Sequence, residues 1–198
     1  FHGENLWWLF RTRDFIPEYD KIYCVSEPVR KQVIARFPEL ADRTEVLLNF
    51  IDIKQVQRRS EEPLSDPQYT GELKFLTVGR ASEEKGYDIA VQITAELKKR
   101  GLRFKWFIIG DGRDLNKLRT MAKEYQVEQE IIFLGMRENP APYVKSCDLY
   151  LQPSRHEGYP ITIVEARSLQ KVIIASDIPS MREQIRDGEN GYLCPLDV

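Results

Sequence analysis

Two carboxylates follow a short apolar run at a spacing that suits an elongated, hydroxyl-rich ligand. Glu157 lies just ahead of a predicted helix that Pro160 can begin, because the missing proline N–H would be unpaired there anyway. Glu165 lies about one and a half turns inside that helix. The two side chains cannot address one atom, but each carboxylate can accept two adjacent sugar hydroxyls. The alternative is that Glu157 only complements the helix dipole and Glu165 is a surface residue.

An earlier loop, residues 79–86, places Arg80 and Lys85 beside glycines and just ahead of another predicted helix. A diphosphate is bound by this combination of fixed cations, free backbone N–H groups and the positive end of a helix. The alternative is a solvated turn in which the two cations pair with Glu83 and Glu84. Taken alone, this loop leaves both interpretations open.

A second glycine loop, residues 110–112, lets the chain turn tightly into its helix. Neither glycine loop is a dinucleotide fingerprint, since Ala81 and Leu115 stand where G-x-G-x-x-G requires glycine. The sequence also contains no G-x-x-x-x-G-K-[ST] phosphate loop. These departures disfavour an NAD enzyme and a P-loop NTPase.

The elements that must position these loops alternate between short apolar runs and helical segments. We expect strands at 21–25, 44–48, 73–78, 104–109, 131–134, 149–151, 172–175 and 191–194, and helices at 27–37, 87–99, 114–125, 142–146, 160–169 and 181–185. Repeated strand–helix–strand units predict an α/β fold with a parallel sheet and helices on both faces. Ligands in such sheets bind at the carboxyl ends of the strands, where the loops above lie.

Composition supports a globular protein. The chain has 198 residues, of which 42% are hydrophobic and 30% charged. A net charge of −2 gives no electrostatic reason to expect nucleic acid as a partner. No apolar run approaches the roughly 20 residues of a membrane span. Because the sequence begins with Phe1 rather than Met, we expect a piece of a longer protein.

The three cysteines, Cys24, Cys147 and Cys194, form neither a disulfide framework nor a metal-ligand pair. Cys24 and Cys194 stand in apolar runs, where a buried, reduced thiol is expected. Reduced cysteines favour a cytoplasmic location.

Several motifs in order resemble those of the family-four retaining glycosyltransferases, whose GT-B fold has two Rossmann-like lobes facing a cleft. The segments are V-G-R-A-S-E-E-K-G at 78–86, I-I-G-D-G at 108–112, F-L-G at 133–135, E-G-Y-P-I-T-I-V-E-A at 157–166, and the closing A-S-D-I-P-S and G-E-N-G-Y-L. Glu157 and Glu165 match the E-x7-E motif. The resemblance implies a remnant of the N-terminal, acceptor-binding lobe at 1–57, a polar linker at 58–72 and a nucleotide-sugar-binding Rossmann-like lobe at 73–198.

The resemblance also implies roles for individual residues. Arg80 and Lys85 would bind the donor diphosphate, and Glu157 would face the hydroxyls of the donor sugar; these three are the expected catalytic residues. Glu165 would hold the ribose hydroxyls. His2 is similar to a first-lobe histidine that reaches the donor sugar, or it is an ordinary histidine at a strand end.

Other residues are expected to bind substrate mainly through backbone groups. These are Gly79, Gly110, Ser154, Gly158, Tyr159 and Ile161, with the nucleobase near Met136 and Arg137. Pro160 departs from the family pattern, where many members have glycine, and it offers no N–H to a ligand.

The reaction implied is transfer of a sugar from a nucleoside diphosphate to an acceptor hydroxyl with retention of configuration. Fixed cations and helix N-termini would stabilise the leaving diphosphate, so neither a metal nor another cofactor is expected. The acceptor, a glycan or a lipid-linked molecule, would bind through the missing lobe, and the complete protein could associate with the inner face of a membrane. Two alternatives remain: a non-catalytic nucleotide-sugar-binding module, and a glycoside hydrolase with a Glu157–Glu165 pair.

Overall fold

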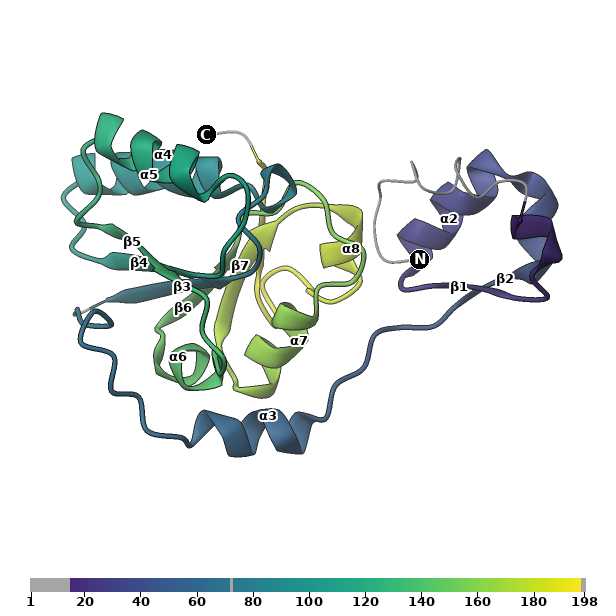
Figure 1. The fold of residues 1–198 in the computed structure, drawn as a ribbon, viewed down its shortest axis with the longest axis horizontal. Coiled ribbons are helices and arrows are strands. Elements are labelled where there is room, and N and C mark those ends of the chain that lie inside the picture. The colour runs from purple at the N-terminus through teal and green to yellow at the C-terminus, as the bar shows by residue number, and fades with distance from the viewer. Residues whose placement is uncertain (1–14, 72, 197–198) are drawn as a thin grey trace.

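The computed structural model describes residues 15–71 and 73–196 and has an α/β architecture with two sheets (Figure 1). The larger sheet holds β3 (Lys74–Val78), β4 (Lys105–Ile109), β5 (Ile131–Gly135), β6 (Leu149–Gln152), β7 (Val172–Ser176) and β8 (Tyr192–Cys194). Its helices are α4 (Tyr87–Lys99), α5 (Leu115–Glu124), α6 (Ala141–Ser146), α7 (Ile161–Ser168) and α8 (Pro179–Arg182). The predicted parallel sheet with helices on both faces is confirmed.

Side-chain alternation along the strands explains why both faces of the sheet are covered. Phe75 and Trp106 pack in a core with residues of α4 and α5, whereas their neighbours Leu76 and Phe107 pack in a second core with residues of α6 and α7. In Figure 1, α4 and α5 lie on one side of the sheet and α6 and α7 on the other. Burial on both faces accounts for the nearly continuous apolar runs of these strands.

The strand order places a switch in direction between β3 and β6. The order is β5-β4-β3-β6-β7-β8, with every pair parallel. The chain therefore builds outward from β3 through β4 to β5, then returns to the other side of β3 and builds outward through β7 to β8. The loops that leave β3 and β6 diverge at their carboxyl ends, which opens a crevice in sheets of this kind.

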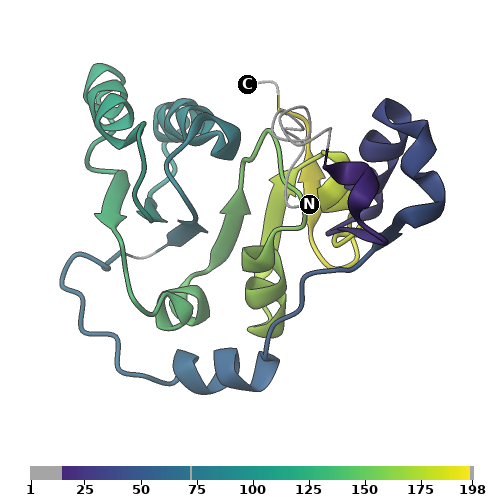
Figure 2. The ribbon, with the colours of Figure 1, turned by 45° about the vertical axis from the view of Figure 1, so that its right-hand side comes forward.

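A smaller α/β unit precedes this lobe and has a core of its own. Its elements are η1 (Ile16–Glu18), β1 (Ile22–Cys24), α2 (Glu27–Arg36), η2 (Pro38–Arg43) and β2 (Thr44–Val46), and β1 and β2 pair in parallel. The Ser26 hydroxyl caps α2 by accepting from the N–H of Val29 at 3.4 Å. Figure 2 shows this unit beside the lobe, near α8, and the carboxylate of Glu183 accepts from the backbone N–H of Glu27 at 3.0 Å.

The segment between the two bodies differs from the prediction. Helix α3 (Ile53–Ser60) occupies it, so the first residues of the predicted linker at 58–72 are helical. The Asp52 carboxylate caps α3 by accepting from the N–H of Gln55 at 3.0 Å. Helix α3 lies against α6 and α7 on the outside of the lobe (Figure 1). The predicted helix at 181–185 also shifts, because α8 begins at Pro179 and ends at Arg182.

The cysteine prediction is half wrong. Cys24 is buried, as expected, but Cys194 is exposed, because it stands in β8 at the edge of the sheet. Cys147 is buried instead, and burial raises the pKa of its thiol to about 12. In the described ranges, no helix is both long and apolar enough to cross a membrane.

Candidate active site

A pocket of about 950 Å³ opens at the carboxyl ends of β3 and β6, where the chain changes direction. Its wall comes from three places: the loop after β3, the loop from β6 into α7, and two outlying residues. The lining residues are Val78, Gly79, Arg80, Ser82, Glu84, Lys85, His156, Glu157, Gly158, Tyr159, Pro160, Ile161 and Thr162, together with Asn49 and Arg113. The structure therefore brings together most of the predicted site residues.

The loops after β3 and β6 are fastened to each other. Gly86 adopts a positive φ of 65°, and a Cβ there would collide with the carbonyl oxygen of Pro153. The guanidinium of Arg155 donates to both carboxylate oxygens of Asp88 at 2.7 and 2.6 Å, and its backbone N–H donates to Glu84 at 2.8 Å. The bond from Arg155 lowers the pKa of Asp88. These contacts fix the spacing between the two loops.

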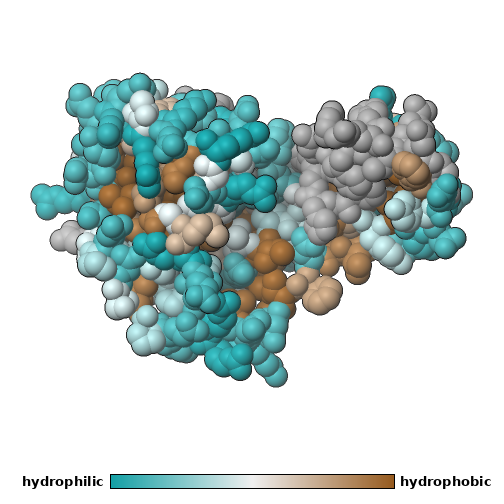
Figure 3. All heavy atoms as spheres, viewed as in Figure 1, coloured by the Kyte–Doolittle hydropathy of each residue, from teal (hydrophilic) through white to brown (hydrophobic). Residues whose placement is uncertain are grey.

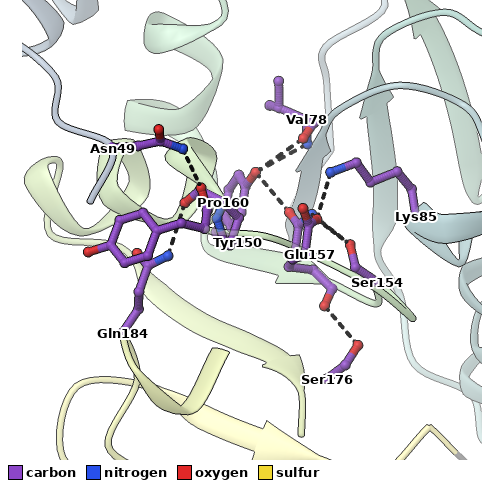
Figure 4. Close-up of polar contacts among 11 residues, drawn as sticks. Asn49, Val78, Lys85, Tyr150, Ser154, Glu157, Pro160, Ser176 and Gln184 are labelled. Atoms are coloured by element: carbon purple, nitrogen blue, oxygen red, sulfur yellow. Dashed lines mark hydrogen bonds and ion pairs between the residues drawn. The ribbon is translucent and has the colours of Figure 1, made fainter. Parts of the chain in front are cut away.

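Glu157 is held by a cluster of polar residues, which we call the Glu157 cluster: Lys85, Gln152, Ser154 and Glu157. Its carboxylate oxygen Oε1 accepts from Lys85 Nζ at 2.6 Å, from Gln152 Nε2 at 2.9 Å and from Ser154 Oγ at 2.7 Å. Figure 4 shows Lys85 and Ser154 both pointing toward Glu157. Only 8% of Glu157 is exposed, yet it lines the pocket.

Arg80 reaches the pocket as an exposed cation. A hydrogen bond from Ser82 lowers the pKa of Glu84, and the charges of Arg113 and Arg80 lower it further. Arg113 also lines the pocket, 3.9 Å from the carboxylate of Glu84. The mouth of the pocket therefore carries the cations that a diphosphate requires.

Hydrogen bonds fix the backbone at the start of α7, beside the pocket. The Pro160 carbonyl accepts from Gln184 Nε2 at 3.3 Å and from the N–H of Ile163 at 3.2 Å (Figure 4). In a trans peptide the C=O and N–H point in opposite directions, so the N–H of Ile161, a residue that lines the pocket, points away from Gln184. Asn49 donates to the Tyr159 carbonyl at 3.2 Å, which fixes the same loop from the other side.

Several predicted residues lie outside the pocket wall. Gly110 stands behind Gly79, where a Cβ would collide with the Gly79 carbonyl oxygen, and Ser154 is fully buried beneath Glu157. Glu165 is not among the described residues that line the pocket; burial raises its pKa, and the charge of Arg59 on α3 acts in the opposite direction.

Arg137, expected near the nucleobase, points elsewhere. Its guanidinium donates to the carboxylate of Asp66 at 2.8 Å, in a separate pocket of about 370 Å³ beside the segment that leads into β3. Its backbone remains the group that could meet a base. His2 lies outside the described residues, so its predicted role is untested.

Sequence reasoning missed several residues of the site, among them Asn49, Arg113 and Gln152. Asn49 and Arg113 line the pocket, and Gln152 bonds to Glu157 from below. Gln152 did carry a signal, because a fully buried sheet strand seldom ends on an amide without a partner for it. In the part of the chain that the structure describes, no group of three or more His, Cys, Asp or Glu side chains could hold a metal ion.

Comparison with known proteins finds a matching family and similar glycosyltransferases. The family described as "Glycosyl transferases group 1" matches residues 59–196. An uncharacterized glycosyltransferase of Methanocaldococcus jannaschii is 29% identical over 183 residues, which cover 90% of this chain and 43% of the relative. The lipopolysaccharide 1,6-galactosyltransferase of Salmonella typhimurium is 30% identical over 174 residues, covering 85% of this chain and 46% of the relative.

Solved structures share the fold. The crystal structure of Anabaena HepE in complex with UDP and glucose superposes with a TM-score of 0.81 at 19% identity, covering 94% of this chain and 53% of that one. This chain spans about half the length of the curated relatives it matches. With the family match extending over most of its length, the chain belongs to the glycosyl transferases group 1 family.

Proposed function

We propose that the pocket binds a nucleoside-diphosphate sugar and that the complete protein transfers the sugar, with retention of configuration, to an acceptor hydroxyl. Arg80, Lys85 and the N-terminus of α7 contact the diphosphate, and Glu157 contacts hydroxyls of the sugar. Glu165 as the ribose ligand and the backbone near Met136 as the contact for the base stay predictions, because neither is among the described residues that line the pocket. The uridine nucleotides named for solved relatives make UDP the first donor nucleotide to test.

One observation carries this proposal: cations and a carboxylate with a spare oxygen face the same pocket. Arg80 and Arg113 reach its mouth, and Lys85 reaches its inner wall. Oxygen Oε1 of Glu157 takes three protein donors, whereas no hydrogen bond to Oε2 is found among the described residues. A nucleotide sugar needs this combination, because its diphosphate is an acceptor of hydrogen bonds and its sugar hydroxyls are donors.

The chemistry follows from where charge develops. As the bond between the sugar and the diphosphate breaks, the departing oxygen takes the electron pair and its negative charge grows. Cations and N–H groups that already point at that oxygen stabilise the transition state more than the ground state. This proposal requires no metal and assigns no protein nucleophile.

The two alternatives predict different behaviour. A glycoside hydrolase would need two carboxylates on either side of one bond. Glu165 is not among the described residues that line the pocket with Glu157, which argues against that reaction. A non-catalytic module would bind the nucleotide sugar without turnover by the complete protein. The acceptor, and the location at the inner face of a membrane, remain predictions.

Calorimetric titration of the 198-residue chain with UDP and with uridine tests the proposal. Arg80→Ala should weaken UDP by about 1.5–3 kcal/mol, the contribution of a hydrogen bond to a charged group, and leave uridine nearly unchanged. Arg119→Ala, which removes an exposed arginine on α5, is the matched control and should change neither affinity. Equal losses for UDP and uridine in Arg80→Ala would place this side chain away from the diphosphate.

A further inference from the structure

Gln152 is a buried amide at the end of β6, directly beneath the pocket. Only 1% of the residue is exposed, and it is not among the described residues that line the pocket wall. Burying an amide costs free energy unless its donors and acceptor are paired. Its hydrogen bonds therefore show what the residue does.

The amide is bonded on both sides. Its oxygen accepts from the hydroxyl of Tyr150 at 3.2 Å, and its nitrogen donates to Ser154 Oγ and to Glu157 Oε1, both at 2.9 Å. The opposite orientation would place the amide oxygen against the Glu157 carboxylate, acceptor against acceptor. Because a carboxylate only accepts, Glu157 sets the orientation of the amide, and the hydroxyl of the fully buried Tyr150 donates to the amide oxygen in that orientation.

The backbone of Gln152 is fixed as well. Its carbonyl accepts from Ser176 Oγ at 3.2 Å, and β6 pairs with β7 along its whole length. The amide thus projects from a rigid position on the central sheet. A donor anchored in this way can fix the rotation of the carboxylate that it contacts.

The rotation of the Glu157 carboxylate decides which of its two oxygens is available to a ligand. Lys85, Gln152 and Ser154 all donate to Oε1, which saturates that oxygen. Oxygen Oε2 is left for the pocket that Glu157 lines. Gln152 and Ser154 also donate to Oε1, so Lys85 uses only one of its three N–H donors on Glu157. Its other two N–H groups can donate to another acceptor.

We propose that Gln152 is a positioning residue for recognition of the donor sugar. By holding Oε1 it turns Oε2 of Glu157 toward the sugar hydroxyls, and it leaves Lys85 able to serve the diphosphate. Tyr150 supports this role by donating a hydrogen bond to the amide oxygen. The inference rests on the proposed binding of a nucleotide sugar in this pocket.

The test compares affinities of the chain for UDP and for three conjugates: UDP-glucose, UDP-galactose and UDP-N-acetylglucosamine. The measured quantity is the ratio between the affinity of the tightest conjugate and that of UDP. Gln152→Met keeps the length of an unbranched side chain and removes both amide groups. It should lower this ratio about fivefold to tenfold, the net contribution of one ordinary hydrogen bond, while UDP affinity stays within about twofold.

Gln184→Met is the matched control, because Gln184 is also buried and bonds to the pocket loop at Pro160 rather than to Glu157. It should change both affinities by the same factor and leave the ratio unchanged. Tyr150→Phe removes the hydroxyl that donates to the amide oxygen of Gln152 and should lower the ratio in the same direction by a smaller factor. If Gln152→Met fails to fold, Tyr150→Phe still tests whether Gln152 contributes to the ratio of conjugate affinity to UDP affinity.

The outcomes separate the two proposals. If the unsubstituted chain binds neither UDP nor any conjugate, the proposed function fails. If it binds a conjugate more tightly than UDP and Gln152→Met and Tyr150→Phe keep that ratio, only the role of Gln152 is overturned. A ratio of one in the unsubstituted chain also overturns that role, because Glu157 would then contribute nothing to sugar recognition.

Discussion

Two carboxylates, Glu157 and Asp66, are almost equally buried, each is paired with a cation, and yet the protein uses their oxygens differently. In the Glu157 cluster all three donors go to Oε1. Asp66 accepts hydrogen bonds on both oxygens. Oδ2 accepts from Arg137 at 2.8 Å and from the Tyr143 hydroxyl at 2.9 Å, and Oδ1 accepts from the N–H of Gln68 at 2.9 Å.

This difference separates a binding carboxylate from a structural one. Asp66, Arg137 and Tyr143, which we call the Asp66 cluster, satisfy one another and fasten the segment that leads into β3 to the loop after β5. The Glu157 cluster leaves one acceptor open toward a pocket with cations at its mouth. A buried charge with an unused hydrogen-bonding site is costly, and such sites occur where a ligand supplies the missing partner.

The largest difference should appear in sugar transfer by the complete protein. In Glu157→Gln an amide N–H₂ replaces the carboxylate oxygen that accepts hydrogen bonds from the hydroxyls of the donor sugar. We expect a loss of about 100-fold in turnover. Asp66→Asn alters only the structural cluster, and we expect turnover within about threefold of the unsubstituted protein. Initial rates with a UDP-sugar measure both. Similar losses in the two variants would break the distinction between the clusters.

For the free energy of unfolding we expect the opposite order, with the larger loss in Asp66→Asn and the smaller loss in Glu157→Gln. In Glu157→Gln the amide oxygen can still accept from all three donors, and the N–H₂ takes the place of the unused oxygen, so unfolding free energy should change by less than about 1 kcal/mol. In Asp66→Asn the N–H₂ must face either Arg137 or the N–H of Gln68, both donors, and we expect a loss of about 2 kcal/mol. Urea unfolding of both variants at pH 7 gives the comparison. A larger loss in Glu157→Gln would show that Oε2 has a protein partner.

A smaller effect should appear with pH. Burial acts to raise the pKa of Asp66, but bonds from Arg137, Gln68 and Tyr143 outweigh it and hold the pKa below the ordinary value of 3.8. A lowered folded pKa means that this stabilisation is present above about pH 4 and is lost as the pH falls through the folded value. The gap in unfolding free energy between the unsubstituted chain and Asp66→Asn should therefore shrink as pH falls from about 5 to about 3. A gap that stays constant would mean that the Asp66 charge contributes nothing.

The sequence predicted the lobe well because its signals are local. Strand β3 begins one residue later than expected, and α4 covers the predicted 87–99. Apolar runs buried on both faces and helices with a regular apolar stripe carry the periodicity that such predictions use. The segments around Arg80 and Glu157 were found because glycines, cations and a proline mark the loops after β3 and β6.

What the sequence could not show depends on contacts between distant segments. Helix α3 is short and mostly polar and buries only one residue, Ser60, so its sequence resembles a linker when the lobe against which it lies is not considered. Asn49 donates to the Tyr159 carbonyl across 110 positions of the sequence. The direction of Arg137 toward Asp66 is likewise invisible without the folded segment between α3 and β3.

The path of α3 across the outside of the lobe decides where the molecule can bend. Gln57 donates to the Ser168 carbonyl, Arg59 donates to the Glu138 carbonyl, and Glu61 pairs with Lys145, so the chain after residue 52 is carried along with the lobe. Any swing of the small unit must then turn about residues 47–52, a stretch whose apolar side chains lie exposed where the two bodies meet (Figure 3). Asn49 belongs to this pivot and also to the wall of the pocket. Because Asn49 also donates to the Tyr159 carbonyl, a change in the path of this stretch acts directly on the pocket wall.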